Sequence, residues 1–402
     1  MLLNAIIIIV VLALAGYLAF SRRLAGSKKW DATVTPLASI MGSGFLVTAP
    51  LLAGIVGNLA LACMAVLLVL SYAVGSAIRF NIRHFEPIES DKGLVQDIAF
   101  LSRVVLAGAY FITVTYYLQL LAAFLLSAFG IHNEMLASSI TTVLLVLICG
   151  IGIWRGLDEL EMVERYAVSL NLGMIGALLL ALAVYNVQLL GSGEWRLPDV
   201  SSTINLHDFR VLLGLLIVVQ GFETSRFLGD EHPAETRIAT MRTAQLVSAA
   251  IYLVFIGLAT VLFKDSFGAD VTAIIKMTAP VAAVLPILLS IAAIGSQFSA
   301  AVADNSGAGG LLEDITERKL PIRLAYLLIL FITVVLTWQT NVNAIIAYAS
   351  RAFALFYMLQ CLVALMVCFE NKDLARRKLR MALFAAVTLA CLTVFIFGLS
   401  SE

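Results

Sequence analysis

Long apolar runs, separated by short polar connections, repeat along the whole chain. A stretch of about 20 apolar residues is the length at which an α-helix crosses the hydrocarbon core of a bilayer. The pattern therefore predicts an all-α polytopic membrane protein with about twelve transmembrane helices. The expected spans are residues 3–20, 33–56, 59–80, 98–129, 136–153, 166–190, 209–227, 241–263, 281–302, 324–338, 344–369 and 381–399.

Two of these spans are interrupted by residues that do not favour a continuous helix. The second contains Gly42-Ser43-Gly44, and the seventh contains Gln220-Gly221-Phe222-Glu223. An interior glycine costs about 1 kcal/mol relative to alanine, and backbone groups freed from a helix find no partner in hydrocarbon. We therefore interpret both stretches as broken membrane helices that line a binding site. The structural alternative is a small-residue face at which two helices pack closely.

The two breaks also indicate an internal repeat. Each falls in the first member of a group of five spans, and because five is odd the second group must be inverted relative to the first. Matching interrupted helices in inverted repeats meet near the membrane midplane and form solute and ion sites. The expected units are an extra N-terminal helix with an inner loop (1–30), a first five-helix repeat (31–190), an outer loop (191–208), a second, inverted five-helix repeat (209–370) and an additional C-terminal helix (371–402).

Composition supports this class and excludes several others. Hydrophobic residues make up 61% of the 402 residues and charged residues 13%, which rules out an ordinary soluble globule. The formal net charge is zero, so no nucleic-acid partner is expected. Five cysteines without a CxxC pair and four scattered histidines predict neither disulfides nor a zinc site. We expect no cofactor.

The positive charges lie asymmetrically along the predicted topology. All but five of the 26 lysines and arginines fall in connections on one side, and the exceptions are Arg196, Arg210, Lys264, Lys276 and Arg351. Because cytoplasmic loops carry the excess of Lys and Arg, both termini are placed outside the cytoplasm. The expected location is the lipid bilayer of a bacterial plasma (inner) membrane. The oligomeric state is left open.

Three stretches resemble parts of known transporters. Ile40-Met41-Gly42-Ser43-Gly44-Phe45-Leu46-Val47-Thr48-Ala49-Pro50 resembles the first core helix of the amino acid-polyamine-organocation (APC) transporters, and Gly221-Phe222-Glu223 followed by Glu231-His232-Pro233-Ala234-Glu235 resembles their sixth. The ninth span, with Ser296-Gln297-Phe298-Ser299, is similar to the eighth core helix of the sodium/solute symporters. The resemblance implies the fold of the bacterial leucine transporter, with five plus five inverted helices, over roughly residues 33–369.

The two breaks supply the candidate solute site. Amides at Gly42, Ser43 and Gly44 would lie near the positive end of a half-helix, which suits a carboxylate. Glu223 is an acid near membrane depth, where a charge is costly unless it is paired, protonated or facing water. It could hold a substrate ammonium, carry a coupling proton, gate the inner path or pair with Arg226. The other candidates are Phe45 and Phe222 as apolar walls, Gln220 and Gly221 at the second break, and Tyr116 and Gln119 as polar groups of the fourth span, with helix packing and interhelical hydrogen bonds as alternatives.

For a coupling ion, the resemblance implies a site between the first broken helix and the ninth span. It would use the backbone carbonyls of Ala38 and Met41, with Gly295, Ser296 and Ser299 opposite them. Phe298 stands where the pattern wants a hydroxyl, whereas a hard cation prefers several oxygen ligands. Sodium is the favoured coupling cation, and proton coupling or exchange is the alternative.

Two further charges lie in apolar segments and need an explanation. Arg351 is surrounded by apolar residues and requires an acidic partner or an anionic ligand. Asp304, Glu223 and a substrate carboxylate are the candidates, so Asp304 and Arg351 are expected to act in gating or charge pairing. Snorkelling of the arginine towards one interface is the alternative.

Together these features favour a secondary active transporter. It would be a symporter of a small amino acid or related organic solute, working by alternating access and coupled to a cation. A solute-sensing membrane module of the same fold, without transport, is the alternative. An enzyme is not expected, because the sequence has no HExxH motif, no nucleophile–base arrangement and no paired catalytic acids near a predicted cavity.

The orientation can be tested with a reporter enzyme that is active only outside the cytoplasm, fused to either terminus. Both fusions are expected to be active, because the charge asymmetry places both ends outside. A fusion within the connection 371–380, which is predicted to be cytoplasmic, serves as the inactive control. An inactive C-terminal fusion would require one span more or one fewer.

Overall fold

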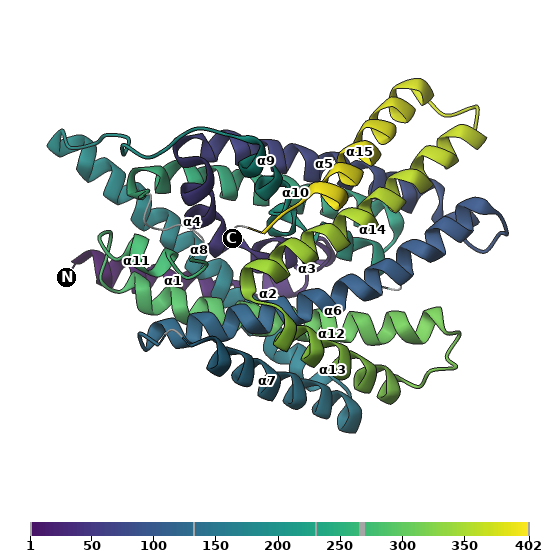
Figure 1. Cartoon of the computed structure of the whole chain (residues 1–402), viewed down its shortest axis with the longest axis horizontal. Coiled ribbons are helices and arrows are strands. Elements are labelled where there is room, and N and C mark those ends of the chain that lie inside the picture. Colours follow the sequence, from purple (N-terminus) through teal and green to yellow (C-terminus); the bar gives the residue numbers. More distant parts are fainter. Residues whose placement is uncertain (1, 132, 230, 265–269, 401–402) are drawn as a thin grey trace.

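The computed structural model describes residues 2–131, 133–229, 231–264 and 270–400, and this part of the chain consists of helices and connections without a β-strand (Figure 1). Ten of its helical segments are long and apolar enough to cross a membrane. The protein is therefore an all-α integral membrane protein, as predicted. Ten segments replace the twelve expected spans because Lys28–His84 counts as one segment and the seventh span contains no long helix.

The helices follow one another along the chain with short connections. The long ones are α1 (Leu2–Phe20), α3 (Lys28–Ser43), α4 (Phe45–Val56), α5 (Ala60–His84), α6 (Leu94–Ala128), α7 (Glu134–Arg155), α8 (Asp158–Ser192), α10 (Ala234–Ala259), α12 (Leu285–Ile315), α13 (Ile322–Gln339), α14 (Val342–Glu370) and α15 (Arg377–Phe397). The short ones are α2 (Arg22–Ala25), α9 (Leu206–Leu213) and α11 (Ile274–Thr278), with 3₁₀ turns η1 (Gly57–Leu59), η2 (Glu86–Ile88), η3 (Leu216–Val219), η4 (Phe222–Phe227) and η5 (Thr260–Leu262).

The second span is broken, as expected, and the break is narrow. Helix α3 begins at Lys28, where the Ser27 hydroxyl oxygen accepts a hydrogen bond from the Trp30 amide at 3.3 Å and caps the first turn. The helix ends at Ser43, and α4 begins at Phe45. Gly44 between them has φ −175° and ψ 10°, which is not helical. The interruption is thus a single residue.

The seventh span differs from the expectation of two half-helices around a short break. Only α9 is an α-helix, and the chain then runs through η3 and η4 to Phe227. Such backbone is tolerated where protein surrounds it and supplies hydrogen-bond partners. The Ser350 hydroxyl accepts from the Ile217 amide at 2.9 Å and donates to the Gly214 carbonyl at 2.6 Å, and Ser71 Oγ donates to the Val219 carbonyl at 3.1 Å.

Three polar stretches between the long apolar runs are partly or wholly helical. The charged stretch 156–165, which the charge pattern predicts to be an inner loop, is largely the start of α8, because helix begins at Asp158; the side chains of 158–165 lie outside the described part. The glycine-rich stretch that follows Val302 continues α12 to Ile315. In the semi-polar stretch 264–279, α11 packs on α4 and α12 with Ile274, Met277 and Thr278 buried, and residues 265–269 are not described.

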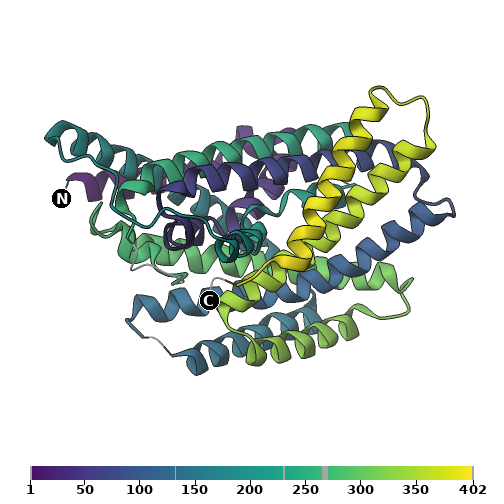
Figure 2. The same ribbon diagram turned by 45° about the horizontal axis from the view of Figure 1, so that its top comes forward.

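A central group of helices is flanked by the two terminal ones. Helix α6 packs against both α12 and α14, α10 against α3 and α5, and α7 against α13. The two views show α15 running antiparallel along α14 at the end of the chain (Figures 1 and 2). Helix α1 lies along α8, where Gly173 permits close approach: a Cβ there would lie 2.8 Å from the Ala15 amide nitrogen. Most of the apolar side chains of α1 are exposed, as lipid contact requires.

Candidate functional site

The two broken spans touch each other at their glycines. A Cβ on Gly221 would lie 2.6 Å from the Ser39 carbonyl carbon and 2.7 Å from the Ile40 amide nitrogen. Its φ of +116° also lies in the left-handed region that favours glycine. On the other side, a Cβ on Gly44 would lie 2.9 Å from Val218 Cα. Each glycine therefore lets the backbone of the opposite broken span come into direct contact.

Side chains from neighbouring helices bind the carbonyls that the breaks release. The Tyr252 hydroxyl of α10 is within hydrogen-bonding distance of the Ile40 carbonyl, at 3.2 Å, and of the Val218 carbonyl. Gln297 Nε2 of α12 donates to the Gly42 carbonyl at 3.0 Å, and Thr48 Oγ1 donates to the Gly44 carbonyl at 2.7 Å. Several of the carbonyls freed at the two breaks are thus bonded within the protein, as membrane burial demands.

A cavity of about 790 Å³ begins beside the first break. One wall is a stripe of α3, and the opposite wall is a longer stripe of α12, both at helical spacing. The α3 residues are Thr35, Ala38, Ser39 and Gly42; the α12 residues are Ser296, Ser299, Ala300, Ala303, Asp304, Ser306, Gly307, Gly310, Leu311 and Asp314. Tyr110 and Tyr117 of α6, Asn171 of α8 and Thr224 of η4 add further polar groups to the wall, and the cavity is large enough for a small organic solute.

The mouth of the cavity carries ion pairs between different elements. Arg103 of α6 pairs with Asp314 of α12 at 2.8 Å, and Arg226 pairs with Glu89 at 3.6 Å. All four residues line the cavity. They belong to connections or helix ends that the charge pattern assigns to the cytoplasmic side. The cavity therefore opens towards the predicted inner face, while the second break is covered by packed side chains.

Comparison with known proteins settles the family. A model described as APC superfamily transporter matches residues 22–398. The chain belongs to the APC superfamily of transporters. A protein of Aquifex aeolicus (strain VF5), described only as uncharacterized, is 41% identical over 396 residues, which cover 96% of this chain and 95% of that protein. The crystal structure of a mutant of the Eremococcus coleocola manganese transporter aligns with a TM-score of 0.49 and 11% identity, over 93% of this chain and 95% of that chain.

Several predicted residues of this APC transporter lie together at the cavity. Ala38, Gly42, Ser296, Ser299 and Asp304 all line it. The Ser299 side chain makes no hydrogen bond within the described part of the chain, whereas Ser296 Oγ donates to the Ala293 carbonyl at 3.2 Å. Asp304 accepts a hydrogen bond from Thr113 Oγ1. The side chain of Ser43 lies outside the described part.

The predicted aromatic walls pack behind the cavity rather than along it. Phe45 contacts the rings of Tyr252 and Phe255, with ring centroids 5.3 and 4.4 Å apart. Phe222 stacks on Tyr357 with centroids 5.3 Å apart. Both phenylalanines are 1% exposed. In this conformation, Phe45 and Phe222 therefore pack between helices and do not form walls of the solute site.

The remaining solute candidates also lie outside the cavity wall. Gln119 Nε2 donates to the carbonyls of Thr337 and Thr340 at the end of α13, so it makes the interhelical hydrogen bonds considered as the alternative. Gln220 Nε2 donates to the Tyr117 hydroxyl at 2.9 Å and thereby contacts a cavity residue. Tyr116 is buried beside Tyr117. Met41, Gly44, Gly221 and Gly295 are not among the described cavity-lining residues.

Glu223 does not pair with Arg226, which is one of the alternatives that the sequence leaves open for this acid. Its Oε2 accepts from the Gly221 amide at 2.9 Å and from the Tyr357 hydroxyl at 2.7 Å, and the side chain is 1% exposed. Arg226 instead contacts Glu89 and donates to Gln360 Oε1. The carboxyl group of Glu223 therefore fixes the backbone at the second break, and the cavity wall begins at the next residue, Thr224.

Arg351 corrects the prediction of a charge pair with Asp304 or Glu223. Its Nε donates to the Phe395 carbonyl of α15 at 2.8 Å, and its guanidinium lies 5.9 Å from the centroid of the Phe395 ring. The described structure pairs Arg351 with neither acid. The arginine side chain points away from the central helices and towards α15. There the carbonyl of Phe395, near the end of that helix, accepts its hydrogen bond.

Sequence reasoning missed some cavity residues that a periodicity count could have found. Tyr110 and Tyr117 are seven residues apart on α6 and therefore share a helix face. Ser39 lies three residues before Gly42, and Asn171 stands in the sixth span facing the same cavity. No motif marks Ser39 or Tyr110, and the signal that could locate them is the helical spacing of polar positions.

Replacing Gly221 by alanine is expected to lower the free energy of unfolding by about 2 kcal/mol or more. The new Cβ would collide with the backbone of Ser39 and Ile40 in a conformation that disfavours it. Gly257 of α10 is the matched control, because a Cβ there meets nothing within 4 Å. Thermal unfolding in detergent should show a lower melting temperature for Gly221→Ala than for the unmodified protein. The melting temperature of Gly257→Ala should not decrease. Equal stability of both variants would contradict the close contact between the breaks.

Proposed function

We propose that this protein is a secondary active transporter of a small amino acid or related organic solute, which works by alternating access and is coupled to a cation. The observation that carries the proposal is the cavity, which joins the first break on α3 to hydroxyls and a carboxylate on α12 and opens on one side. Membership of the APC superfamily supports transport in general. The solute and the ion are the parts that we infer from the cavity chemistry.

A zwitterionic solute matches the charges on either side of this cavity. The first turn of α4 begins just beyond Gly42, and the N-terminus of a helix favours a carboxylate. Asp304, with Thr113 beside it, provides an anionic group on the opposite helix for an ammonium. Tyr110 and Tyr117 add hydroxyls between them. This polarity favours an amino acid over an apolar or purely anionic solute.

The coupling cation is proposed to bind between α3 and α12, with sodium favoured and the proton as the alternative. The last carbonyls of a helix lack intrahelical partners, and those of Ile40 and Gly42 are occupied by Tyr252 and Gln297. The Met41 carbonyl lies between these two in the last turn of α3, and it is the one that we propose as an ion ligand. Ser299 offers its hydroxyl, and Ala38, one turn inside α3, can offer only the second lone pair of its carbonyl.

The helix contacts support the inverted repeat on which alternating access would rest. In the proposed order α6 is the third core helix and α12 the eighth, and these two pack on each other. Helix α6 packs on α14 just as α12 packs on α8, and α5 meets α10 as α7 meets α13. The α6–α14 and α12–α8 contacts are counterparts in the two proposed repeats, whereas the α5–α10 and α7–α13 contacts each join two equivalent helices. Two such halves can rock against each other around a fixed site.

A non-transporting solute sensor of the same fold is the second candidate. It would have the same cavity and bind the same solute, so binding alone does not separate the two functions. Flux does separate them.

The transport proposal is tested with proteoliposomes that contain the purified protein. An inward sodium gradient is expected to drive uptake of at least one labelled proteinogenic amino acid above the level seen with an equal potassium gradient. An inward proton gradient without sodium is the second condition, because it tests the alternative ion. Binding of an amino acid without flux under either gradient would favour the sensor, and neither binding nor flux for any amino acid would refute the solute class.

Replacing Ser299 by alanine is expected to raise the sodium concentration for half-maximal stimulation about tenfold, or about 1.4 kcal/mol, because one oxygen ligand is lost. Ser290 is the matched control, since it is a buried serine of the same helix that bonds the Pro286 carbonyl and lies away from the cavity. Sodium titrations of uptake measure the effect. An unchanged sodium dependence in Ser299→Ala would place the ion elsewhere.

A further inference from the structure

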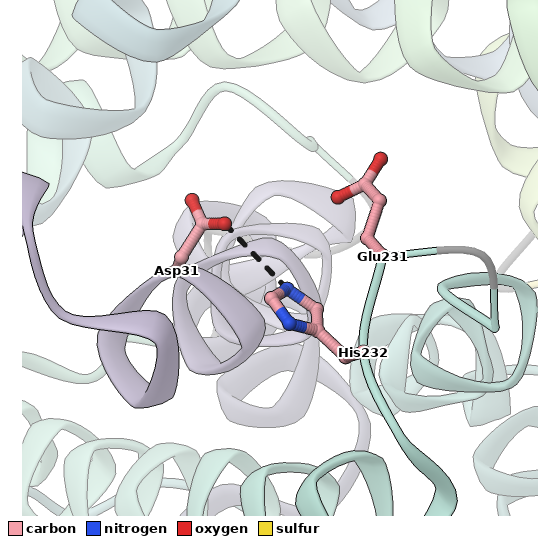
Figure 3. A group of neighbouring side chains, drawn as sticks. All are labelled: Asp31, Glu231 and His232. Atoms are coloured by element: carbon pink, nitrogen blue, oxygen red, sulfur yellow. Dashed lines mark ion pairs between the residues drawn. The ribbon is translucent and has the colours of Figure 1, made fainter.

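Three potential metal ligands lie together at the end of α3 that is remote from the break (Figure 3). Asp31 stands in the first turn of α3, and Glu231 and His232 belong to the connection between η4 and α10. His232 Nε2 lies 3.5 Å from Asp31 Oδ2, and one donor atom from each of the three residues falls within 4.8 Å of the others. The sequence pattern does not indicate this cluster, because Asp31 lies far along the chain from Glu231 and His232.

The imidazole is held in place by the surrounding structure. The side chain of His232 is only 6% exposed. Its amide donates to the Leu228 carbonyl at 2.9 Å, and its carbonyl accepts from Arg237 Nε at 3.0 Å. The charge of Arg237 is balanced by a bidentate salt bridge with Glu86, in which the two guanidinium nitrogens Nη1 and Nη2 donate to Oε1 and Oε2 at 2.9 and 2.7 Å. The ring is therefore fixed by its backbone and directed towards two carboxylates.

The donor set selects a class of ion. One imidazole nitrogen with two carboxylate oxygens suits zinc and other divalent first-row transition metals. Calcium and magnesium prefer sites made only of oxygen. Zinc bonds of about 2 Å place neighbouring ligand atoms about 3.3 Å apart in a tetrahedral site. Asp31 and Glu231 are exposed and can close the remaining gap by side-chain rotation.

We propose that Asp31, Glu231 and His232 bind a divalent transition-metal cation that links α3 to the segment following η4. Helix α3 packs against both η4 and α10, so the bound metal stabilises the arrangement in which these elements are close. A ligand shifts a conformational equilibrium towards the state to which it binds better. The metal would thus hold this conformation, with its cavity open on one side. The binding site itself does not depend on the proposed transport function; only the effect on flux does.

Zinc is the probe for the binding experiment, which uses the full chain in detergent. Cys63 is replaced by serine in every sample, because it is the one cysteine that is not buried. Isothermal titration calorimetry is performed on this background and on Asp31→Asn, Glu231→Gln and His232→Gln. Glu235→Gln is the matched control, since Glu235 is a nearby exposed carboxylate that pairs with Arg83 instead. Melting without metal verifies that each variant is folded.

The background protein and Glu235→Gln are expected to bind one zinc ion with the same affinity, and each of the three site variants at least tenfold more weakly. Loss of affinity in Asp31→Asn is decisive if His232→Gln is unstable, because Asp31 is exposed and lies on the other element. No zinc binding to the background protein, or an affinity unchanged by Asp31→Asn, would overturn the site.

The conformational effect has its own test, which rests on the proposed function. Zinc on the side of the cavity mouth is expected to slow uptake by the background protein and to leave Asp31→Asn at its zinc-free rate. Zinc that binds but slows neither protein would overturn the link to conformation. Absence of flux in all samples, with zinc binding intact, would instead count against transport and leave the metal site standing.

Discussion

The structure depends on one constraint, which is that backbone polar groups inside a membrane protein must be bonded by the protein itself. Two spans give up regular helix, and several of the carbonyls released there accept hydrogen bonds from side chains of neighbouring helices. Ser71, Tyr252, Gln297 and Ser350 provide these bonds from α5, α10, α12 and α14. The same four helices surround the breaks, so the hydrogen bonds that permit irregular backbone also determine where the broken spans lie.

The two breaks have different structural roles. The first is a single residue, and the α3 stripe before it forms a wall of the cavity, so its backbone is near the space a solute would occupy. The second is longer and lies behind packed side chains, with Glu223 bonded to the Gly221 amide and Tyr357. Removing the Glu223 carboxyl would leave a buried amide without its acceptor, which costs more than the loss of one exposed hydrogen bond. Its role in this conformation is to fix the backbone.

The fold followed from the sequence further than the site did. Apolar run length located the membrane helices, and the glycines at 44 and 221 marked both breaks, because these signals are local. The length of the second break is not encoded in the local sequence. Leu216–Val219 is as apolar as a membrane helix, and only partners on other helices make it a 3₁₀ turn. The predicted charge pair of Arg351 was wrong for the same reason. Its actual partner is a carbonyl on α15, and the residues next to Arg351 in the sequence do not indicate that contact.

The hydroxyl of Tyr252 has a consequence for how the two broken spans can move. A phenol carries one hydrogen, yet two carbonyls lie within its reach, one from α3 and one from η3. While the spans touch, one proton serves both. A displacement of either span by about an ångström leaves the proton with a single acceptor and the other carbonyl unbonded, so sliding is opposed until a new donor arrives. The tyrosine thus ties the two broken spans together, and a movement of one span past the other would have to break one of these two contacts.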